Sequence, residues 1–490
     1  MNFLFIIPGF FNIEPYQKLL YYNDLPLGSL QISSYLKERN KIETDIIDMR
    51  IEEERDSKWN PQSNDLYKFE QHCEKVLESA AIQNFKNIGI SCYTSFQYLQ
   101  TKIIAEIIKK SYRDKNVFVG GYHPSANPHD FTFKNSPFDY IIINEAELIL
   151  SKYLSKNENI TTKKSRETQI FREKRYIDVN ELPPPDYNLY LNKYPYFDKY
   201  KFDLYTSRGC PYQCTFCSIN YRFRVYSFEH FKNVFDELVQ VVLNQNKKYP
   251  KISFADQAFF SIPIKEKILD YIIKQQLQES INFSCQSRIE TIASDLSILN
   301  KIKISKLIIG YGLESADKSL LVEMNKTRNP NYYLEMAEKI IQKYTEYELN
   351  YCRLNVLCGF PGEDKKSFNN TFKFLEENAS HENIQISPSL FACYPNTPAF
   401  HNMKKYEELY GSEFNKRWWE SKKNQFKLSV LRKCSHKYSL KDLLYDYKEN
   451  YISILKIFKF SNFRDLATWK QFYSNWYNEL SSANQLKNQN

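Results

Sequence analysis

Short apolar segments recur along the first 150 residues, and the stretches between them follow a different periodicity. Five of these segments are rich in β-branched residues and predict strands, over 2–7, 44–48, 87–92, 116–121 and 139–143. Between them, residues 29–40 and 95–112 repeat apolar side chains at helical spacing. The alternation predicts an α/β domain over residues 1–150, doubly wound and Rossmann-like, with ligands at the carboxyl ends of its parallel strands.

Residues 151–200 interrupt this alternation. The segment TTKKSRETQ is polar, and ELPPPDYNLY carries three consecutive prolines. Proline fixes its own φ and restricts the residue before it, so the interval predicts an extended linker.

Strand and helix patterns return at wider spacing over residues 201–395. Six strands are expected, at 203–207, 251–256, 281–287, 306–312, 353–359 and 383–389. Helical patterns fill the intervals, for example at 227–245 and 332–344. Six strand and helix pairs fall short of the roughly 250 residues of a complete eight-stranded barrel. We therefore expect a partial, open (β/α)6 barrel, followed over 396–490 by a helical C-terminal extension with helical periodicity at 440–458.

Composition places the chain among globular proteins. A hydrophobic content of 42% with 26% charged residues excludes disorder throughout. No run approaches the roughly 18 apolar residues of a membrane span. The apolar start MNFLFII has no basic segment before it and is broken by Pro8 and Gly9, unlike a signal peptide. We therefore expect a cytoplasmic protein without a membrane partner.

The counts of cysteine and glycine direct attention to particular positions. Ten cysteines without a signal peptide argue against a disulfide scaffold and favour metal or redox chemistry. Glycine is scarce, with 11 in 490 residues, against a usual share of about 7%. We expect such a chain to keep glycine where only glycine fits, and most of its glycines follow a predicted strand.

The motif SRGCPYQCTFCSIN places Cys210, Cys214 and Cys217 directly after a predicted strand. Three thiolates at this spacing on one loop can bind three corners of a cubane cluster and leave the fourth iron without a protein ligand. Structural zinc is the alternative, but it needs four ligands, and the next histidine, His230, lies 13 residues on within a helical pattern. Three unrelated structural thiols are a further alternative.

With this motif the chain resembles the radical S-adenosylmethionine (radical SAM) superfamily, in the branch with an N-terminal cobalamin (B12)-binding domain. The resemblance runs from the first strand to about residue 400. It implies a [4Fe-4S] cluster held by the three cysteines. It also implies that the unligated iron binds S-adenosyl-L-methionine and delivers the electron that releases a 5′-deoxyadenosyl radical.

Further segments match this family in order along the predicted barrel. They are ISFADQAFF, SCQSRIE, IIGYGLESADKSLLVEMNK, LCGFPGEDKKSF and FACYPNTPAF. The resemblance implies that S-adenosylmethionine is contacted by Phe216, Arg288, Glu314, Gly359 and Pro361. Asp256 is a candidate catalytic residue, which could contact substrate or cap a helix.

Each of these assignments has a structural alternative. Arg288 and Glu314 could form a salt bridge with each other, because they follow neighbouring strands. Phe216 could be an ordinary packed aromatic residue. Gly359 and Gly362 could serve a turn that has no ligand.

In the N-terminal domain, the resemblance implies cobalamin contacts at the strand ends, from Gly28, Thr94, Ser95, Gly120, Gly121, His123, Pro124 and Glu145. The family's acidic segment usually reads Gly-Glu-Gly-Glu, whereas here it is Asn144-Glu145-Ala146-Glu147. The chain also has no D-x-H-x-x-G segment that would supply a histidine to cobalt. The alternatives are a surface histidine without a ligand at position 123, and a structural domain that binds nothing.

The last 90 residues hold four of the five tryptophans, with 17 Lys and Arg against 9 Asp and Glu. Such a tail could bind an acidic substrate, a leader peptide or nucleic acid, or it could be a solvated helical face with packed aromatics. A pI of about 8.7 lies below the value above 9 that is usual for nucleic-acid binding. We do not expect a nucleic-acid partner.

Three functions follow from the sequence. The first is a cobalamin-dependent radical SAM methyltransferase that acts on an unactivated carbon of a natural-product intermediate or peptide. It would need a small-molecule or peptide substrate and an electron donor such as flavodoxin or ferredoxin. The second is a radical SAM enzyme without cobalamin, which catalyses a rearrangement, oxidation, epimerisation or peptide crosslink. The third is a non-catalytic iron–sulfur binding or sensor protein.

Overall fold

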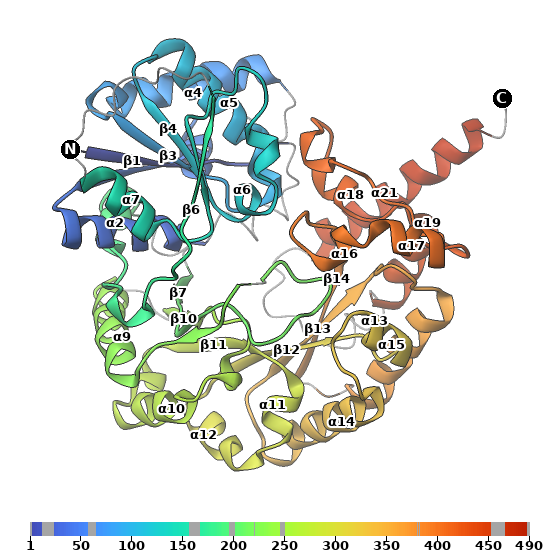
Figure 1. Cartoon of the computed structure of the whole chain (residues 1–490). Coiled ribbons are helices and arrows are strands. Elements are labelled where there is room, and N and C mark those ends of the chain that lie inside the picture. Colours follow the sequence, from blue (N-terminus) through green and yellow to red (C-terminus); the bar gives the residue numbers. More distant parts are fainter. Residues whose placement is uncertain are drawn as a thin grey trace.

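The structure is a computed structural model of the whole chain. It describes residues 2–11, 24–56, 65–155, 167–195, 201–219, 221–245, 250–379, 381, 383–451 and 466–487. An N-terminal α/β domain lies above an open barrel, and the C-terminal elements lie beside both (Figure 1). The α/β fold expected from the sequence is confirmed.

The N-terminal sheet has six parallel strands in the order β2-β1-β3-β4-β5-β6. They are β1 Asn2–Ile7, β2 Glu43–Asp48, β3 Asn87–Ser91, β4 Asn116–Gly120, β5 Tyr140–Ile143 and β6 Gln169–Arg172. The sixth strand falls within the stretch 151–200, where the sequence predicted an extended linker. Its side chains are mostly exposed at the edge of the sheet, so its sequence lacks the apolar pattern of a buried strand.

Alternate residues of β1 enter two different cores, as the period of a strand requires. Phe3 and Phe5 pack with the helices α2 (Leu27–Asn40) and α7 (Glu147–Ser155). Leu4 and Ile6 pack on the other face with α4 (Leu66–Ser79) and α5 (Tyr98–Ser111). Helices cover both faces of the sheet, so a ligand can reach it only at the loops that follow its strands.

The second sheet is the open barrel, with six parallel strands in the order β14-β13-β12-β11-β10-β7. They are β7 Phe202–Leu204, β10 Lys251–Phe254, β11 Asn282–Ser287, β12 Ile308–Glu314, β13 Cys352–Cys358 and β14 Ile384–Leu390. The partial (β/α)6 barrel expected from the sequence is thus present.

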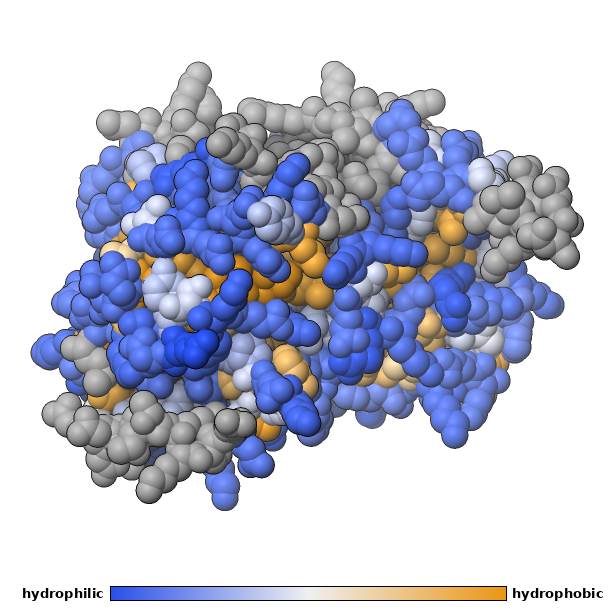
Figure 2. Space-filling view, turned by 90° about the horizontal axis from the view of Figure 1, so that it is seen from above, coloured by the Kyte–Doolittle hydropathy of each residue, from blue (hydrophilic) through white to orange (hydrophobic). Residues whose placement is uncertain are grey.

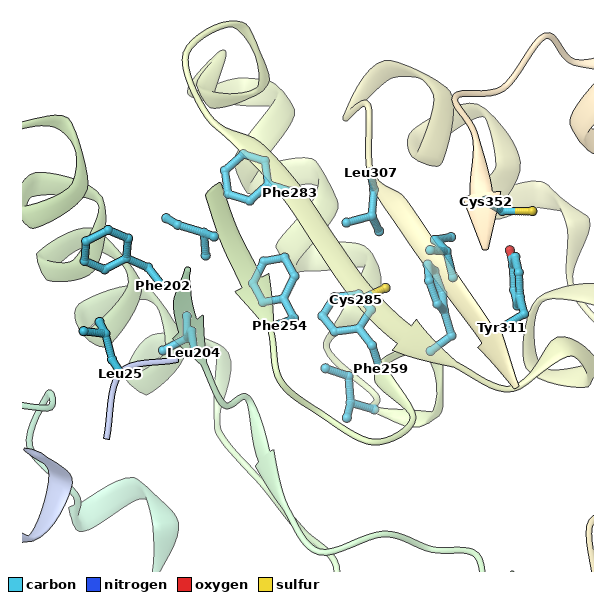
Figure 3. Packing of buried hydrophobic residues seen from close by; sticks show 14 of the residues in the cluster. Leu25, Phe202, Leu204, Phe254, Phe259, Phe283, Cys285, Leu307, Tyr311 and Cys352 are labelled. Atoms are coloured by element: carbon cyan, nitrogen blue, oxygen red, sulfur yellow. The ribbon is translucent and has the colours of Figure 1, made fainter. Parts of the chain in front are cut away.

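Helices cover the outer face of this sheet (Figure 1). They include α9 Phe228–Leu243, α10 Lys265–Lys274, α12 Leu299–Ile304, α14 Pro330–Glu346 and α15 Lys365–Asn378. Apolar side chains such as Phe254 and Phe283 point from the strands into the packed layer beneath these helices (Figure 3). The residues that alternate with them face the concave side of the sheet.

The C-terminal region contains α16 Pro398–His401, α17 Met403–Tyr410, α18 Gln425–Ser429, α19 Leu440–Asp446, α21 Leu466–Lys487 and the small antiparallel pair of β15 Lys433–Ser435 and β16 Tyr438–Ser439. Residues 452–465, which include part of the helical pattern at 440–458, lie outside the described residues. Trp418, Trp419 and Trp476 are buried. These aromatic residues pack inside the protein and do not form an exposed basic face.

Hydrophilic residues dominate the face seen in Figure 2, with apolar residues visible in the gaps between them. Across the helices of the described part, none has the length and apolarity that a membrane crossing requires.

Candidate functional site

The three cysteines of the motif lie on a loop whose base is closed by a two-residue ladder. The strands β8 (Ser207–Arg208) and β9 (Arg224–Val225) pair antiparallel, with Ser207 opposite Val225 and Arg208 opposite Arg224. We call the segment between them, residues 209–223, the cysteine loop. Among the ten cysteines, only the three on this loop are partly exposed, whereas the other seven are buried.

Backbone hydrogen bonds hold the cysteine loop against the barrel. The amide of Thr215 donates to the carbonyl of Met324 at 2.9 Å, and its hydroxyl donates to the carbonyl of Glu323 at 3.0 Å. The amide of Ala399 in turn donates to the carbonyl of Thr215 at 2.9 Å. The loop therefore rests between α13 (Lys318–Glu323) and the start of α16.

The donor set on this loop fits an iron–sulfur cluster. In the described residues, no three Cys, His, Asp or Glu side chains gather closely enough to hold a single metal ion. A cubane places each cysteine on a different iron, so its ligands need not converge on one point. Burial raises the pKa of the Cys217 thiol to about 11 and also raises that of Cys210. Cluster binding would therefore release protons from these thiols.

Arg288 lies beside the cysteine loop, after β11. Its Nη1 is 3.4 Å from Sγ of Cys214, and its guanidinium lies 4.1 Å from the ring centre of Tyr212. Arg288 also forms an ion pair with Glu290 at 2.5 Å and donates to the carbonyl of Lys326. A fixed positive charge thus stands next to the thiols.

Glu314 ends β12 and pairs with the buried Lys326, with 3.2 Å between its Oε1 and the Nζ of the lysine. The alternative of a salt bridge between Arg288 and Glu314 is therefore wrong, because each side chain has a different partner. Sequence reasoning missed Lys326, which lies in the quoted segment LVEMNK, 12 residues after Glu314.

The backbone of Glu314 has a φ of +66° at an irregularity in the register of β12. A positive φ is uncommon for a residue other than glycine, and at the end of a strand it marks a local constraint on the backbone. A Cβ at Gly312 would lie 2.4 Å from Oε1 of Glu314 and 2.7 Å from Nζ of Lys326. Gly312 therefore makes room for the Glu314–Lys326 pair.

Asp256 lies beneath the base of the cysteine loop. Its carboxylate accepts hydrogen bonds from the amide and the hydroxyl of Thr206, the latter at 2.9 Å, and from the hydroxyl of Ser207. Burial raises the pKa of this carboxyl to about 6. Its partners belong to the strand segment before the cysteines, not to a helix N-terminus, and its catalytic role stays a prediction.

The turn after β13 faces the C-terminal region. Gly359 and Gly362 have φ values of +84° and +91°. A Cβ at Gly359 would lie 2.7 Å from Leu443, and one at Gly362 would lie 3.1 Å from the ring of Tyr410. Conformation and packing thus both require glycine here. The contacts of Gly359 and the buried Pro361 with S-adenosylmethionine stay predictions.

The turn after β13 also contains the buried Glu363. Its carboxylate accepts a hydrogen bond from the amide of Gly359. Burial raises the pKa of Glu363 to about 8.

Phe216 of the cysteine loop is partly buried against the small core that contains Phe360 and Phe391. This packing agrees with its structural alternative, and a contact with adenine stays a prediction.

His123 is fully buried, which is at odds with the alternative of a surface histidine. Its Nδ1 is 2.6 Å from Oγ of Ser95, and its Nε2 is 3.0 Å from Oδ2 of Asp130. Burial lowers the pKa of the His123 ring. Both ring nitrogens are occupied, so in this arrangement neither is open to a metal ion.

Two glutamates of the acidic segment reach the base of the cysteine loop. Glu145 pairs with Arg208 at 3.0 Å and also with Arg224, and Glu147 pairs with Arg208 at 2.6 Å. Burial raises the pKa of Glu145, but hydrogen bonds and charge from the two arginines outweigh it and lower that pKa overall. Sequence reasoning assigned Glu145 to cobalamin and missed both arginines.

The remaining candidates lie at the strand ends of the N-terminal sheet. Thr94 caps the short helix Ser95–Gln97, and Pro124 is buried. Gly121 has a φ of +115°, and a Cβ there would lie 2.4 Å from the carbonyl oxygen of Cys92. Gly120 and Gly28 are less constrained, since a Cβ at Gly120 would come no closer than 3.7 Å to a heavy atom and one at Gly28 would meet none within 4 Å. Their contacts with cobalamin stay predictions.

The carboxyl ends of the N-terminal strands approach the cysteine loop. Tyr122, after β4, and Tyr221, in the cysteine loop, have hydroxyl oxygens 2.5 Å apart. The ring of Tyr93, after β3, lies 5.1 Å from that of Tyr122. The carboxyl ends of the N-terminal strands therefore contact the loop that carries the three thiols.

Several known proteins are similar to this chain over part of its length. An uncharacterized methyltransferase of Pyrococcus horikoshii is 26% identical over 308 residues, which is 59% of this chain and 64% of that protein. An uncharacterized methyltransferase of Synechocystis sp. is 23% identical over 308 residues, which is 60% of this chain and 52% of that protein. The chain thus matches less than two thirds of the length of each of these relatives. Among solved structures, the radical SAM enzyme coproporphyrinogen III oxidase of Escherichia coli aligns with a TM-score of 0.31 and 14% identity, over 42% of this chain and 48% of that one.

Two family models match separate parts of the chain. The model of the radical SAM superfamily matches residues 204–375, which contain the three cysteines, Asp256, Arg288 and Glu314. The model of the B12 binding domain matches residues 21–154. The chain therefore contains a radical SAM domain and an N-terminal B12-binding domain, and these two domains imply a [4Fe-4S] cluster, S-adenosylmethionine and cobalamin as cofactors.

Proposed function

We propose that the chain is a cobalamin-dependent radical SAM methyltransferase that acts on an unactivated carbon of a small natural-product intermediate or a peptide. The observation that carries the proposal is the contact between the cysteine loop and the strand ends of the B12-binding domain. The Tyr122–Tyr221 and Glu145–Arg208 contacts hold these two edges together. Ligands bound at both edges would face the same space.

The residues at the mouth of the barrel fit this assignment. Cys210, Cys214 and Cys217 would hold the cluster, and Arg288 places a positive charge beside Cys214. When bound, the cluster with S-adenosylmethionine supplies a carbon-centred radical, and methylcobalamin supplies a methyl group. The Glu314–Lys326 pair presents both signs of charge at a strand end, as a zwitterionic amino acid moiety requires. An electron donor of the flavodoxin or ferredoxin class and a cytoplasmic location belong to the same proposal.

One observation favours a radical SAM enzyme that does not use cobalamin. Glu145 and His123, which the resemblance assigns to cobalamin, already bind other side chains. In this second function the N-terminal domain supports the cysteine loop, and the product arises by rearrangement, oxidation, epimerisation or crosslinking.

Product analysis separates the two functions. Full-length protein, anaerobically reconstituted with iron and sulfide, is incubated with S-adenosylmethionine and titanium(III) citrate, with and without hydroxocobalamin. We expect 5′-deoxyadenosine in both samples and S-adenosylhomocysteine only in the sample with the corrin. A corrin spectrum should also survive gel filtration. Absence of S-adenosylhomocysteine and loss of the corrin would support the second function.

A variant with all three loop cysteines replaced by alanine is the matched control, because it keeps both domains but loses the thiols. It should form no 5′-deoxyadenosine. If the wild-type protein also forms none under strong reductant, the chain is not a radical enzyme and the proposal fails.

A further inference from the structure

The ladder at the base of the cysteine loop contains an unfavourable pair. Arg208 and Arg224 stand directly opposite each other on β8 and β9. Like charges on directly opposite residues of an antiparallel pair destabilise the pairing. A ladder of only two residue pairs has little else to hold it together, so this repulsion needs compensation.

The compensation comes from the N-terminal domain. Glu145 bridges the two arginines, with Oε1 at 3.0 Å from Nη1 of Arg208 and Oε2 at 3.1 Å from Nη1 of Arg224. Oε1 of Glu147 lies 2.6 Å from Nη2 of Arg208. The four side chains are between 4% and 19% exposed, so solvent screens these charges weakly.

The ladder is coupled tightly to the first cysteine. Only Gly209 separates Arg208 from Cys210, and its φ is +81°. A Cβ there would lie 2.5 Å from the carbonyl oxygens of Tyr221 and Arg222, so the two arms of the loop touch at this point. Opening of the ladder would therefore move Cys210 relative to the far arm.

We propose that Glu145 and Glu147 are positioning residues of the N-terminal domain, which close the base of the cysteine loop by neutralising Arg208 and Arg224. The N-terminal domain then has a second task besides ligand binding, since it preorganises the thiols of the barrel. The proposal depends on the proposed function only in taking these thiols as cluster ligands, and closure of the ladder can be measured without any cluster.

Hydrogen–deuterium exchange of the full-length, metal-free protein tests the closure. The amide of Tyr226 donates to the carbonyl of Thr206 at 2.9 Å, so peptides across 204–226 report on the ladder. In the double variant E145Q/E147Q we expect exchange in these peptides at least about tenfold faster, with peptides of β1–β4 and β11–β13 unchanged. The variant Glu173→Gln, which removes a carboxylate paired with Lys152 on the same domain, is the matched control.

A third substitution distinguishes neutralisation from mere docking of the two domains. Adding Arg224→Gln to E145Q/E147Q removes the repulsion without restoring any interdomain ion pair. We expect this triple variant to recover protection across the ladder and to retain more iron on anaerobic reconstitution than the double variant. The proposal would be overturned if the peptides across 204–226 exchanged as slowly in E145Q/E147Q as in the wild-type protein. It would also be overturned if the triple variant exchanged as fast as the double variant. If the double variant loses protection throughout the chain, the single variant E145Q, with and without R224Q, decides by the same comparison.

A separate observation concerns the concave face of the barrel sheet. Arg353 lies on β13 between Cys352 and Leu354, which are buried beneath the helices, so its side chain faces the concave side. Arg353 is partly exposed there, and within the described part of the chain its guanidinium makes no hydrogen bond or ion pair. The charge of Lys201 is close enough to interact with that of Arg353, but Lys201 pairs with Asp203 at 3.0 Å.

The surroundings of Arg353 are polar and open. In the register of the sheet, Gln286, Gly310 and Arg353 stand side by side. Gln286 is exposed although it lies in a central strand, so solvent reaches the concave face. Its Oε1 accepts a hydrogen bond of 3.0 Å from Asn355, and a Cβ at Gly310 would lie 2.4 Å from the same oxygen. The glycine therefore leaves room for these amides.

The geometry points to a site on this concave face for an anionic group, a carboxylate or a phosphate, with Arg353, the second residue of β13, as its cation. Arginine binds both anions through two parallel hydrogen bonds, and the amides of Gln286 and Asn355 can bind polar atoms beside them. This assignment goes beyond the proposed function, because Arg353 lies at the amino-terminal end of β13, whereas the cysteine loop follows the carboxyl end of β7.

Chemical modification tests the site without turnover. Phenylglyoxal reacts with unpaired guanidinium groups, and peptide mass spectrometry quantifies each labelled arginine in the metal-free, full-length protein. We expect Arg353 to react faster than the ion-paired Arg208 and Arg224, and we expect inorganic phosphate or succinate to protect it. The more protective of the two anions identifies phosphate or carboxylate as the recognised group.

Other outcomes would overturn the assignment. Labelling of Arg353 as slow as that of Arg208, or labelling that neither anion slows, would show that no anion site exists there. Protection by S-adenosylmethionine alone would assign the guanidinium to the cosubstrate. Because the assay needs neither cluster nor radical, its result is independent of the methyltransferase proposal.

Discussion

The indole Nε1 of Trp419 donates a hydrogen bond of 2.7 Å to Oδ2 of Asp130, across 289 positions of the sequence. The same oxygen is 3.0 Å from Nε2 of His123, and Oδ1 of Asp130 pairs with Arg417 at 2.8 Å. The side chain of Asp130 is completely buried. The C-terminal region therefore completes the interior of the B12-binding domain as well as contacting the barrel.

Replacing Trp419 by phenylalanine should loosen this junction. The change keeps an aromatic ring but removes a donor to a buried carboxylate, which costs about 1 to 3 kcal/mol of unfolding free energy. We expect a lower midpoint in urea and faster hydrogen exchange in peptides over 122–131. Trp418→Phe is the control, since its indole donates at 2.9 Å to the carbonyl of Cys393, outside the N-terminal domain. Equal exchange over 122–131 in both variants would contradict the expectation.

Stability should depend on pH through Glu363. Burial raises the pKa of its carboxyl to about 8 in the folded protein, whereas an unfolded glutamate titrates near about 4.3. The folded state thus binds the proton more tightly, so its stabilising effect is complete below the unfolded pKa and is lost as the pH rises toward about 8.

Urea unfolding at several pH values measures this effect. The contribution of Glu363 should fall by about 1.4 kcal/mol per pH unit between these two pKa values. Glu363→Gln keeps an acceptor for the amide of Gly359 but cannot ionise, so the variant should show a flatter profile. A profile as steep as that of the wild-type protein would show that Glu363 does not titrate in this window.

Removing the cation beside Glu314 tests whether this residue belongs to the binding site for S-adenosylmethionine. Lys326→Met leaves the carboxylate of Glu314 without its partner in a poorly solvated position. We expect weaker binding of S-adenosylmethionine in equilibrium dialysis and a drop of about tenfold or more in 5′-deoxyadenosine formation, with iron content retained. Lys405→Met, which removes a lysine paired with Glu323 at the surface, should change neither quantity. If Lys326→Met binds S-adenosylmethionine as tightly as the wild-type protein does, the Glu314–Lys326 pair plays no part in binding it.

Gly312→Ala should disturb the same pair by crowding. The new methyl group would lie 2.4 Å from Oε1 of Glu314, so the carboxylate must move, at a cost of about 1 to 3 kcal/mol. We expect a lower thermal midpoint and slower cleavage of S-adenosylmethionine. Gly28→Ala is the matched control, because no atom lies within 4 Å of the new methyl group there, and it should leave both quantities unchanged. Wild-type cleavage by Gly312→Ala would mean that the pair can shift without consequence.

Features that depend on neighbouring residues were predictable from the sequence. Each strand expected from an apolar run begins within two residues of a strand in the structure. The spacing of the three cysteines identified the loop that alone carries partly exposed thiols. The β6 strand was missed because its side chains are mostly exposed and carry no buried-strand pattern.

Two local patterns, the alternation of strand and helix segments and the cysteine motif, were enough to predict the two α/β domains and the cysteine loop. Only the tertiary structure decided which charges meet, since the partners Arg208 and Glu145 are 63 positions apart and Trp419 and Asp130 are far more distant in sequence. Only the tertiary structure likewise showed that Asp256 accepts a hydrogen bond from Thr206 at the base of the cysteine loop, and that Glu314 forms an ion pair with Lys326. The physical reason is that periodicity records the burial of each residue, whereas an ion pair or a hydrogen bond depends on where two distant segments come together.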